Sequence, residues 1–184
     1  MSSQNYVVPA VSWDDIGAIC DDIRIRFSLA DKAEFPVMDF LETILFQKTG
    51  IVDLLIGDEE EMGPYEGFTD PKGEFIKLRQ DVYENAWNGV GRDRFTVAHE
   101  LGHFFLHTDI PMARAAPSDN IAVFRLSEPQ ANQFAAELLM PRKFMLIDDT
   151  PSIVAERHGV SIGAATNRIR YMNKLRSKRK GSDM

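Results

Sequence analysis

The stretch from Asp93 to His107 constrains the fold more than any other part of the sequence, because it must bury an apolar face and two histidines on one helix. His99 and His103 are four positions apart, so both rings lie on the same helix face, one turn apart. Apolar side chains surround them: Phe95, Val97, Ala98 and Leu101. Burying histidine rings that have no hydrogen-bond or metal partner would cost free energy, because each polar ring loses its contacts with water. The sequence therefore predicts a helix that Asp93 caps and that holds a shared ligand between the two rings.

The motif His99-Glu100-Leu101-Gly102-His103 supplies the residue types that a hydrolytic zinc site needs. Two imidazoles at this spacing reach one tetrahedral ion at about 2.0–2.1 Å. Zinc lowers the pKa of bound water to about 7, and the adjacent Glu100 can take its proton as general base. The competing interpretation is a helix with two surface histidines. The chain has only four histidines, and three of them lie in this helix, which favours the metal site.

Two histidines leave a third protein ligand to be found, and the helix predicted after residue 126 offers candidates. Ser127 and Gln130 form a Ser-x-x-Gln capping box, which predicts that this helix begins at Ser127. Glu128 then lies in the first turn, where the helix dipole favours a carboxylate, and Asn132 lies one turn later, where it can hold a metal ligand by a hydrogen bond. The alternatives are that Glu128 is only a surface acid, and that Glu137 is the ligand. Spacing alone does not choose between them.

His107 stands one further turn along the helix of the motif. Each step of four residues drifts by about 40° around a helix, so His107 is expected to point away from the metal. We interpret it as a helix-end residue favoured by the dipole, with a role behind the metal ligands or at the oxyanion as the alternative. Tyr65, Tyr83 and Arg94 are other groups that could polarise a substrate carbonyl, and the sequence does not choose among them.

The remaining pattern indicates an α+β fold that is mostly helical. Apolar spacing and caps predict helices over 12–29, 36–48 and 127–140. Short apolar runs predict strands over 51–56, 65–69 and 74–79, with a further short strand possible over 121–125. The turn sequence Asp70-Pro71-Lys72-Gly73 joins the second and third strands into a small antiparallel sheet. Residues 58–61 and 85–91 are expected to be loops.

Composition places the chain among globular proteins of a reducing compartment. Its length of 184 residues and 44% hydrophobic residues suit one ordinary domain with a small appendage. The single cysteine, Cys20, excludes an internal disulfide and is expected to be a small buried residue, which fits the cytoplasm. We expect no signal peptide and no membrane span, because the chain has neither the start of a leader nor an apolar run of about 18 residues.

The C-terminal segment resembles a helix-turn-helix. Residues 155–161 look like the end of a first helix and its turn, and Ser161 would cap a second helix. From Ser161 onward the chain has seven basic residues and one acidic residue, while the whole chain has a net charge of −7. An acidic body makes direct DNA binding unfavourable. We expect this segment to pack on the protein or to recognise a partner, and the tail over 177–184 to be disordered.

Two blocks of sequence resemble the ImmA/IrrE family of metallo-endopeptidases. They run from Arg94 to His107 and from Glu128 to Pro141, and the likeness extends over about residues 50–175. The resemblance implies a gluzincin-like zinc site in which Glu128 is the third ligand. It also implies a zincin-like metallopeptidase domain over 1–148 followed by a small helical, helix-turn-helix-like subdomain over 149–176.

The same resemblance implies a function for the predicted site. We expect a cytoplasmic zinc endopeptidase that cleaves a regulatory protein, typically a helix-turn-helix repressor encoded nearby, in a bacterial stress, phage or mobile-element circuit. The alternative is one member of a toxin–antitoxin-like pair that acts by binding its helix-turn-helix partner, with the metal site structural or vestigial.

Overall fold

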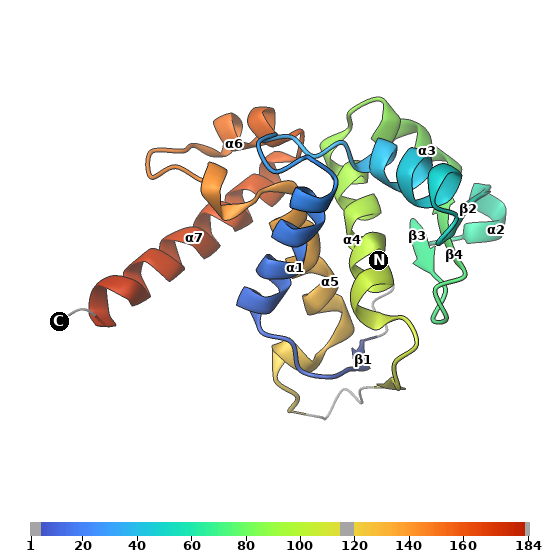
Figure 1. The fold of residues 1–184 in the computed structure, drawn as a ribbon, viewed down its shortest axis with the longest axis horizontal. Helices are drawn as coiled ribbons and strands as arrows, with labels where there is room; N and C mark the ends of the chain where they lie inside the picture. Colours follow the sequence, from blue (N-terminus) through green and yellow to red (C-terminus); the bar gives the residue numbers. More distant parts are fainter. Residues whose placement is uncertain (1–4, 115–119, 183–184) are drawn as a thin grey trace.

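Two packed helices form the centre of the computed structural model, which describes residues 5–114 and 120–182. Helices α4 (Gly91–His107) and α5 (Ser127–Leu139) lie side by side (Figure 1). They approach closely because Gly102 has no side chain: a Cβ there would lie 2.9 Å from the Cα of Ala131. The glycine of the histidine motif therefore brings the start of α5 against the motif.

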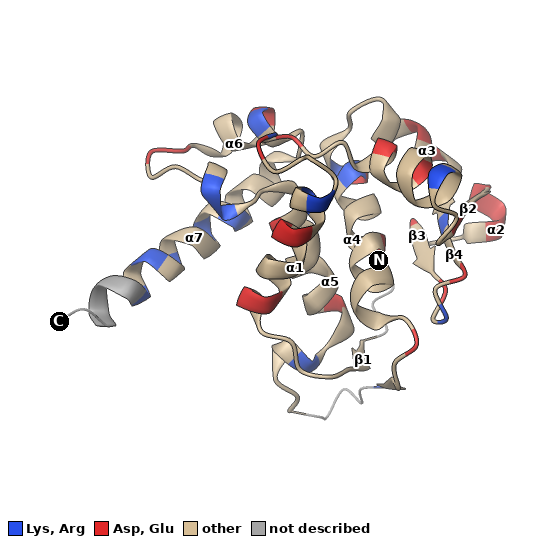
Figure 2. Cartoon of the chain, in the orientation of Figure 1, with Lys and Arg blue, Asp and Glu red and all other residues tan. Residues whose placement is uncertain are grey.

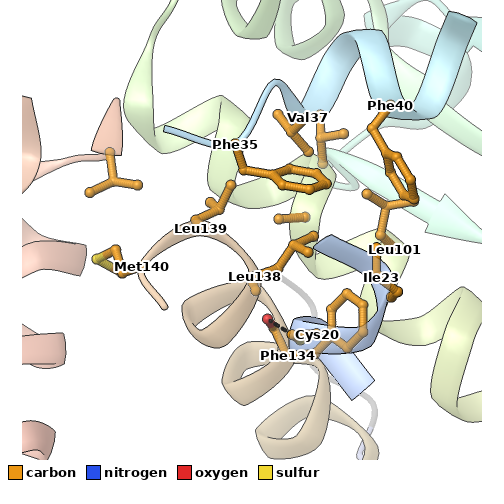
Figure 3. Packing of buried hydrophobic residues seen from close by; sticks show 14 of the residues in the cluster. Cys20, Ile23, Phe35, Val37, Phe40, Leu101, Phe134, Leu138, Leu139 and Met140 are labelled. Atoms are coloured by element: carbon orange, nitrogen blue, oxygen red, sulfur yellow. Dashed lines mark hydrogen bonds between the residues drawn. The ribbon is translucent and has the colours of Figure 1, made fainter. Parts of the chain in front are cut away.

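An apolar core covers the other faces of these two helices. Helix α1 (Trp13–Arg26) and the π-helix η1 (Asp39–Lys48) contribute residues that are entirely buried, such as Ile16 and Phe40. Figure 3 shows Phe40, Leu101 and Phe134 from three different elements in one cluster. Ser12 caps α1 as predicted, since its hydroxyl accepts the Asp15 N–H at 3.1 Å. The expected helices over 12–29 and 36–48 are both present, although they are shorter and the second is a π-helix.

Cys20 is buried as expected, with 1% of its surface exposed. Its thiol contacts the Phe134 carbonyl at 3.5 Å, the dashed line in Figure 3, and burial raises its pKa well above the usual value. A protonated thiol in the core is consistent with a packing role.

A three-stranded sheet lies at one end of the molecule. It contains β2 (Asp53–Gly57), β3 (Gly67–Thr69) and β4 (Phe75–Arg79) in the order β2-β4-β3. β3 and β4 are antiparallel, as predicted, and the Asp70 carboxylate holds their turn by accepting the Lys72 N–H at 2.9 Å. β2 pairs with β4 in parallel, and α2 (Glu59–Met62) lies in the connection that leads from β2 to β3. β3 is an edge strand of this sheet.

Several short elements differ from the sequence expectations. The predicted loops over 58–61 and 85–91 overlap helices α2 and α3 (Gln80–Trp87), and the possible strand over 121–125 is a short 3-10 helix, η2 (Val123–Arg125). A second such turn, η3 (Arg142–Phe144), follows α5. At the N-terminal end, β1 (Tyr6–Val7) pairs with β5 (Ala113–Arg114), a contact between distant segments that no local pattern indicates.

The C-terminal segment forms two helices joined by a tight turn, as expected. α6 (Pro151–His158) ends at Gly159, whose φ of 60° is the left-handed conformation that favours glycine. α7 (Ile162–Ser182) is longer than predicted and includes most of the tail, whose last residues, 183–184, lie outside the described residues. The turn packs on the start of α4, since a Cβ at Gly91 would lie 2.3 Å from the Val160 carbonyl carbon. The expected domain division stays a prediction.

Charge is distributed unevenly along the molecule. Figure 2 shows basic residues along α7 and acidic residues around α2 and α3, towards the opposite end of the long axis. Within residues 5–114 and 120–182, no helix combines the length and the apolar character that crossing a membrane requires.

Candidate metal centre

Three side chains from α4 and α5 converge on one point. Glu128 Oε2 lies 3.3 Å from His99 Nε2, and Glu128 Oε1 lies 3.3 Å from His103 Nε2. The two Nε2 atoms are 3.0 Å apart. His99 is buried, and Glu128 and His103 are partly buried. Among the described residues, these three form the one group of histidine, cysteine or carboxylate side chains whose ligand atoms lie close enough to share a metal ion.

The dimensions of this group fit a small four-coordinate ion. Ligands held tetrahedrally at about 2.0–2.1 Å from an ion lie about 3.3 Å from one another. The spacings of 3.0 Å between the two Nε2 atoms and 3.3 Å from each of them to one Glu128 oxygen are close to this value. Three protein ligands leave one position of a tetrahedron open, which is the arrangement of catalytic rather than structural sites. The residues present therefore fit a catalytic metal ion.

Local structure differs from the prediction at the starts of both helices. Val90, not Asp93, precedes the first residue of α4, and Asp93 is buried, which raises its pKa. Leu126 precedes α5, so Ser127 is the first helical residue rather than the cap. The Ser127 hydroxyl accepts the Tyr6 N–H at 3.1 Å, and no capping box forms. Glu128 still lies in the first turn, where the helix dipole favours its charge.

The two histidines are oriented by different partners. His99 Nδ1 lies 3.1 Å from Asn132 Oδ1, so Asn132 holds His99 with its Nε2 directed to the metal position. His103 Nδ1 lies 3.0 Å from His107 Nδ1, and His107 Nε2 lies 3.0 Å from Gln130 Oε1. His107 is therefore not among the three converging side chains and takes the alternative position behind His103: its Cα drifts around the helix, but the ring turns back against His103.

The electrostatic environment favours a charged carboxylate beside histidines. Burial alone would raise the pKa of Glu128, but hydrogen bonds and positive charge from His103 and His99 hold it well below its usual range. Burial alone would lower the pKa of His99, but Glu128 and Glu100 raise it. Burial lowers the pKa of His107 to about 4, so this ring is neutral near pH 7. Glu128 consequently presents an anionic oxygen to the point where the three side chains converge at neutral pH.

Glu100 lies beside the three ligands and is held by the edge strand β3. Its carboxylate accepts the Thr69 hydroxyl at 2.7 Å, and 6% of its surface is exposed. Gly67 allows this contact, because a Cβ there would lie 2.7 Å from Glu100 Cγ. Neither Thr69 nor Gly67 was predicted from the sequence to contact the site. The turn after residue 69 placed them at the end of a strand, but nothing local indicated which helix that strand would face.

A cleft of about 810 Å³ opens over these residues. Its lining includes His99, Glu100, His103 and Glu128, together with the strand β3. Tyr65 also lines the cleft, so it is the one of the three predicted polarising groups that the structure brings to the site. Its volume lies within the range of pockets that bind ligands, so the candidate metal centre opens into a space that can hold a substrate.

The other candidates are used elsewhere in the fold. Tyr83 donates to Glu42 at 2.8 Å, and Arg94 pairs with Glu34 at 2.9 Å. Glu137, the alternative third ligand, pairs with Arg168 at 2.6 Å and with Arg142 at 2.9 Å. Since an arginine is a permanent cation that binds no metal, Glu137 is excluded as a ligand.

Comparison with known proteins identifies the family. The family model described as the IrrE N-terminal-like domain, Peptidase_M78, matches residues 46–170, a range that includes both blocks of the site. No curated protein and no solved structure matches the chain. Because the match covers more than half of the sequence and contains His99, His103 and Glu128, the chain belongs to the IrrE N-terminal-like family of metallopeptidases.

Proposed function

We propose that the protein is a zinc-dependent endopeptidase in which His99, His103 and Glu128 hold the ion and Glu100 is the general base. One observation carries the proposal: the Glu100 carboxylate and the three converging ligands line the same cleft. A structural metal site would be closed by four protein ligands and would need no buried carboxylate beside it. Two imidazoles and a carboxylate are also the donor set that suits zinc.

Zinc bound at this position would supply a water of lowered pKa and would polarise the substrate carbonyl. Glu100 accepts the proton from the attacking water on its carboxylate and then delivers it to the leaving amine nitrogen. Thr69 donates to Glu100 Oε2 and so fixes the orientation of the carboxylate. Asn132 and His107 orient the rings of His99 and His103.

The edge strand β3 supports an extended protein substrate. Its pairing with β4 on one side leaves it at the edge of the sheet, and it lines the cleft beside Glu100. A polypeptide bound along such an edge gains main-chain hydrogen bonds that do not depend on its sequence. A helix-turn-helix repressor encoded nearby, with cleavage relieving repression in a bacterial stress, phage or mobile-element circuit, is our proposal for the substrate and rests on the resemblance to ImmA/IrrE proteins.

The decisive experiment compares matched variants on that substrate. Zinc-loaded protein is incubated with the helix-turn-helix regulator encoded beside its gene, and products are identified by mass spectrometry. Glu100→Gln should lower the cleavage rate by roughly 10²–10⁴-fold while zinc remains bound. Glu84→Gln, which alters an exposed carboxylate on α3, is the control and should cleave at the wild-type rate.

Two results would overturn the proposal. Cleavage by Glu100→Gln at the wild-type rate would exclude the assigned general base. A chelator that removes zinc and leaves processing of the regulator unchanged would exclude a metal-dependent reaction. A regulator that binds the zinc-loaded protein, with an affinity that chelation alters, and is never cut would favour the toxin–antitoxin-like alternative.

A further inference from the structure

A chain of hydrogen bonds runs from the candidate metal centre to two backbone carbonyls. His103 Nδ1 lies 3.0 Å from His107 Nδ1, and His107 Nε2 lies 3.0 Å from Gln130 Oε1. The Gln130 side-chain nitrogen donates to the Pro9 carbonyl at 2.9 Å and to the Phe124 carbonyl at 2.7 Å. His107 is 3% exposed and Gln130 is 0% exposed, so solvent cannot replace either partner.

The direction of every proton in this chain follows from its anchored end. Backbone carbonyls only accept, so the amino group of Gln130 must face Pro9 and Phe124, and its oxygen must face His107. An amide oxygen also only accepts, so His107 carries its proton on Nε2 and presents the lone pair of Nδ1. His103 must then carry its proton on Nδ1 in order to donate to His107.

We propose that Gln130, acting through His107, is a positioning residue that fixes His103 in the Nδ1–H tautomer and so presents the Nε2 lone pair to the metal. Neutral imidazole in water favours the opposite tautomer, with the proton on Nε2, which cannot bind a metal through that atom. This relay of hydrogen bonds, from Gln130 through His107 to His103, therefore leaves the Nε2 lone pair of His103 available before a metal ion binds. The inference rests on the proposed metal site, but it concerns proton positions that exist without the ion.

The hydrogen bond from Gln130 to the Pro9 carbonyl also connects the N-terminal segment with the candidate metal centre. Pro9 lies outside residues 46–170, the range that the family model matches. The same segment holds the start of α5 through the hydrogen bond from the Tyr6 N–H to Ser127, next to Glu128. Residues 6–9 thus support both Gln130 and the turn that carries the third ligand.

The first test needs no variant. Nitrogen-15 NMR of the metal-free wild-type protein at about pH 8.5, where ordinary histidines are neutral, reports which ring nitrogen of His103 carries the proton. We expect Nδ1 of His103 to carry a proton, with or without a second proton on Nε2, which faces Glu128 at 3.3 Å, and we expect His107 to carry its proton on Nε2 alone. A His103 with its proton on Nε2 alone would overturn the proposal, whatever the protein cleaves.

The second test removes the anchor while keeping its shape. Gln130→Met deletes both the acceptor for His107 and the two donors, and Gln133→Met is the matched control on the same helix, because Gln133 bonds Glu137 at 2.9 Å instead. Gln130→Met should shift His103 to a tautomer mixture and raise the zinc dissociation constant by roughly 10–100-fold, whereas Gln133→Met should change neither. Zinc binding is measured by competition with a chromophoric chelator.

The outcomes separate this inference from the proposed function. An unchanged His103 tautomer in a folded Gln130→Met variant would overturn the relay even if peptide cleavage is confirmed. A tautomer shift together with weaker zinc binding would establish the relay even if no substrate is ever cut. If Gln130→Met does not fold, the tautomer of the wild-type protein decides.

Discussion

Helix α5 carries two carboxylates whose environments differ, although both residues are glutamates on one helix. Glu128, in its first turn, contacts His99 and His103 and lines the cleft. Glu137, near its end, pairs with Arg142 and Arg168 and is almost entirely buried. Histidine can give up its proton and bind a metal ion, whereas arginine remains a cation. The residues that surround each glutamate therefore decide its role: Glu128 can take part in metal binding, whereas Glu137 stabilises the fold.

The largest effect on stability is expected at the arginine end. Glu137→Gln leaves Arg168, whose side chain is 1% exposed, as an unpaired buried charge. Breaking a buried ion pair in this way costs about 3–5 kcal/mol. Urea unfolding of the metal-free protein should show this loss, while the folded fraction should bind zinc with wild-type affinity. A large loss of zinc affinity in Glu137→Gln would contradict the assignment of metal binding to the Glu128 end of α5 alone.

The same substitution at the other end should have the opposite profile. Glu128→Gln removes the anionic ligand, so zinc affinity should fall by at least about 100-fold, beyond the range seen when only residues behind the ligands are changed. Its effect on the free energy of unfolding without metal should be smaller than that of Glu137→Gln, because Glu128 is 20% exposed and its partners can be neutral. Zinc competition and urea unfolding on both variants test the comparison directly. Retained zinc affinity in Glu128→Gln would exclude it as a ligand.

The smallest expected effect is a difference in pH dependence. The pKa of His99 is raised in the folded, metal-free protein above its usual 6.5, so protonation adds stability that is fully present below about pH 6.5 and is lost as the pH rises through the folded-state value. Zinc competes with this proton, so the stabilisation that zinc provides should fall as the pH is lowered through the same window.

The arginine end provides the control for this prediction. Burial alone would lower the pKa of Arg142, but Glu137 and Asp14 raise it, so Arg142 keeps its charge at all ordinary pH values. The destabilisation by Glu137→Gln should therefore be the same at about pH 6 and about pH 8, which span the histidine range. Thermal melting with and without zinc at both values gives the comparison. Equal zinc stabilisation at the two pH values would contradict the assignment of histidine ligands.

Sequence alone determined the parts of the site that depend on local geometry. The spacing of His99 and His103 places both rings on one helix face whatever surrounds them, because the period of the helix is fixed by its backbone. The turn over 70–73 and the cap at Ser12 are likewise encoded within a few residues, and the structure contains both. The choice of Glu128 over Glu137 as the candidate third ligand needed the family resemblance, since spacing left both residues open.

Tertiary structure decided which distant partner each polar group meets. Thr69 and Glu100 are separated by 31 positions, and His107 and Gln130 by 23, so no periodic pattern connects either pair. From the sequence, Gln130 fits a capping role, and His107 fits a helix-end role as well as the alternative role behind the metal ligands. The close approach of α4 and α5 at Gly102 brings these residues together instead. A buried polar group takes whichever partner the packing supplies, and only the folded chain specifies that packing.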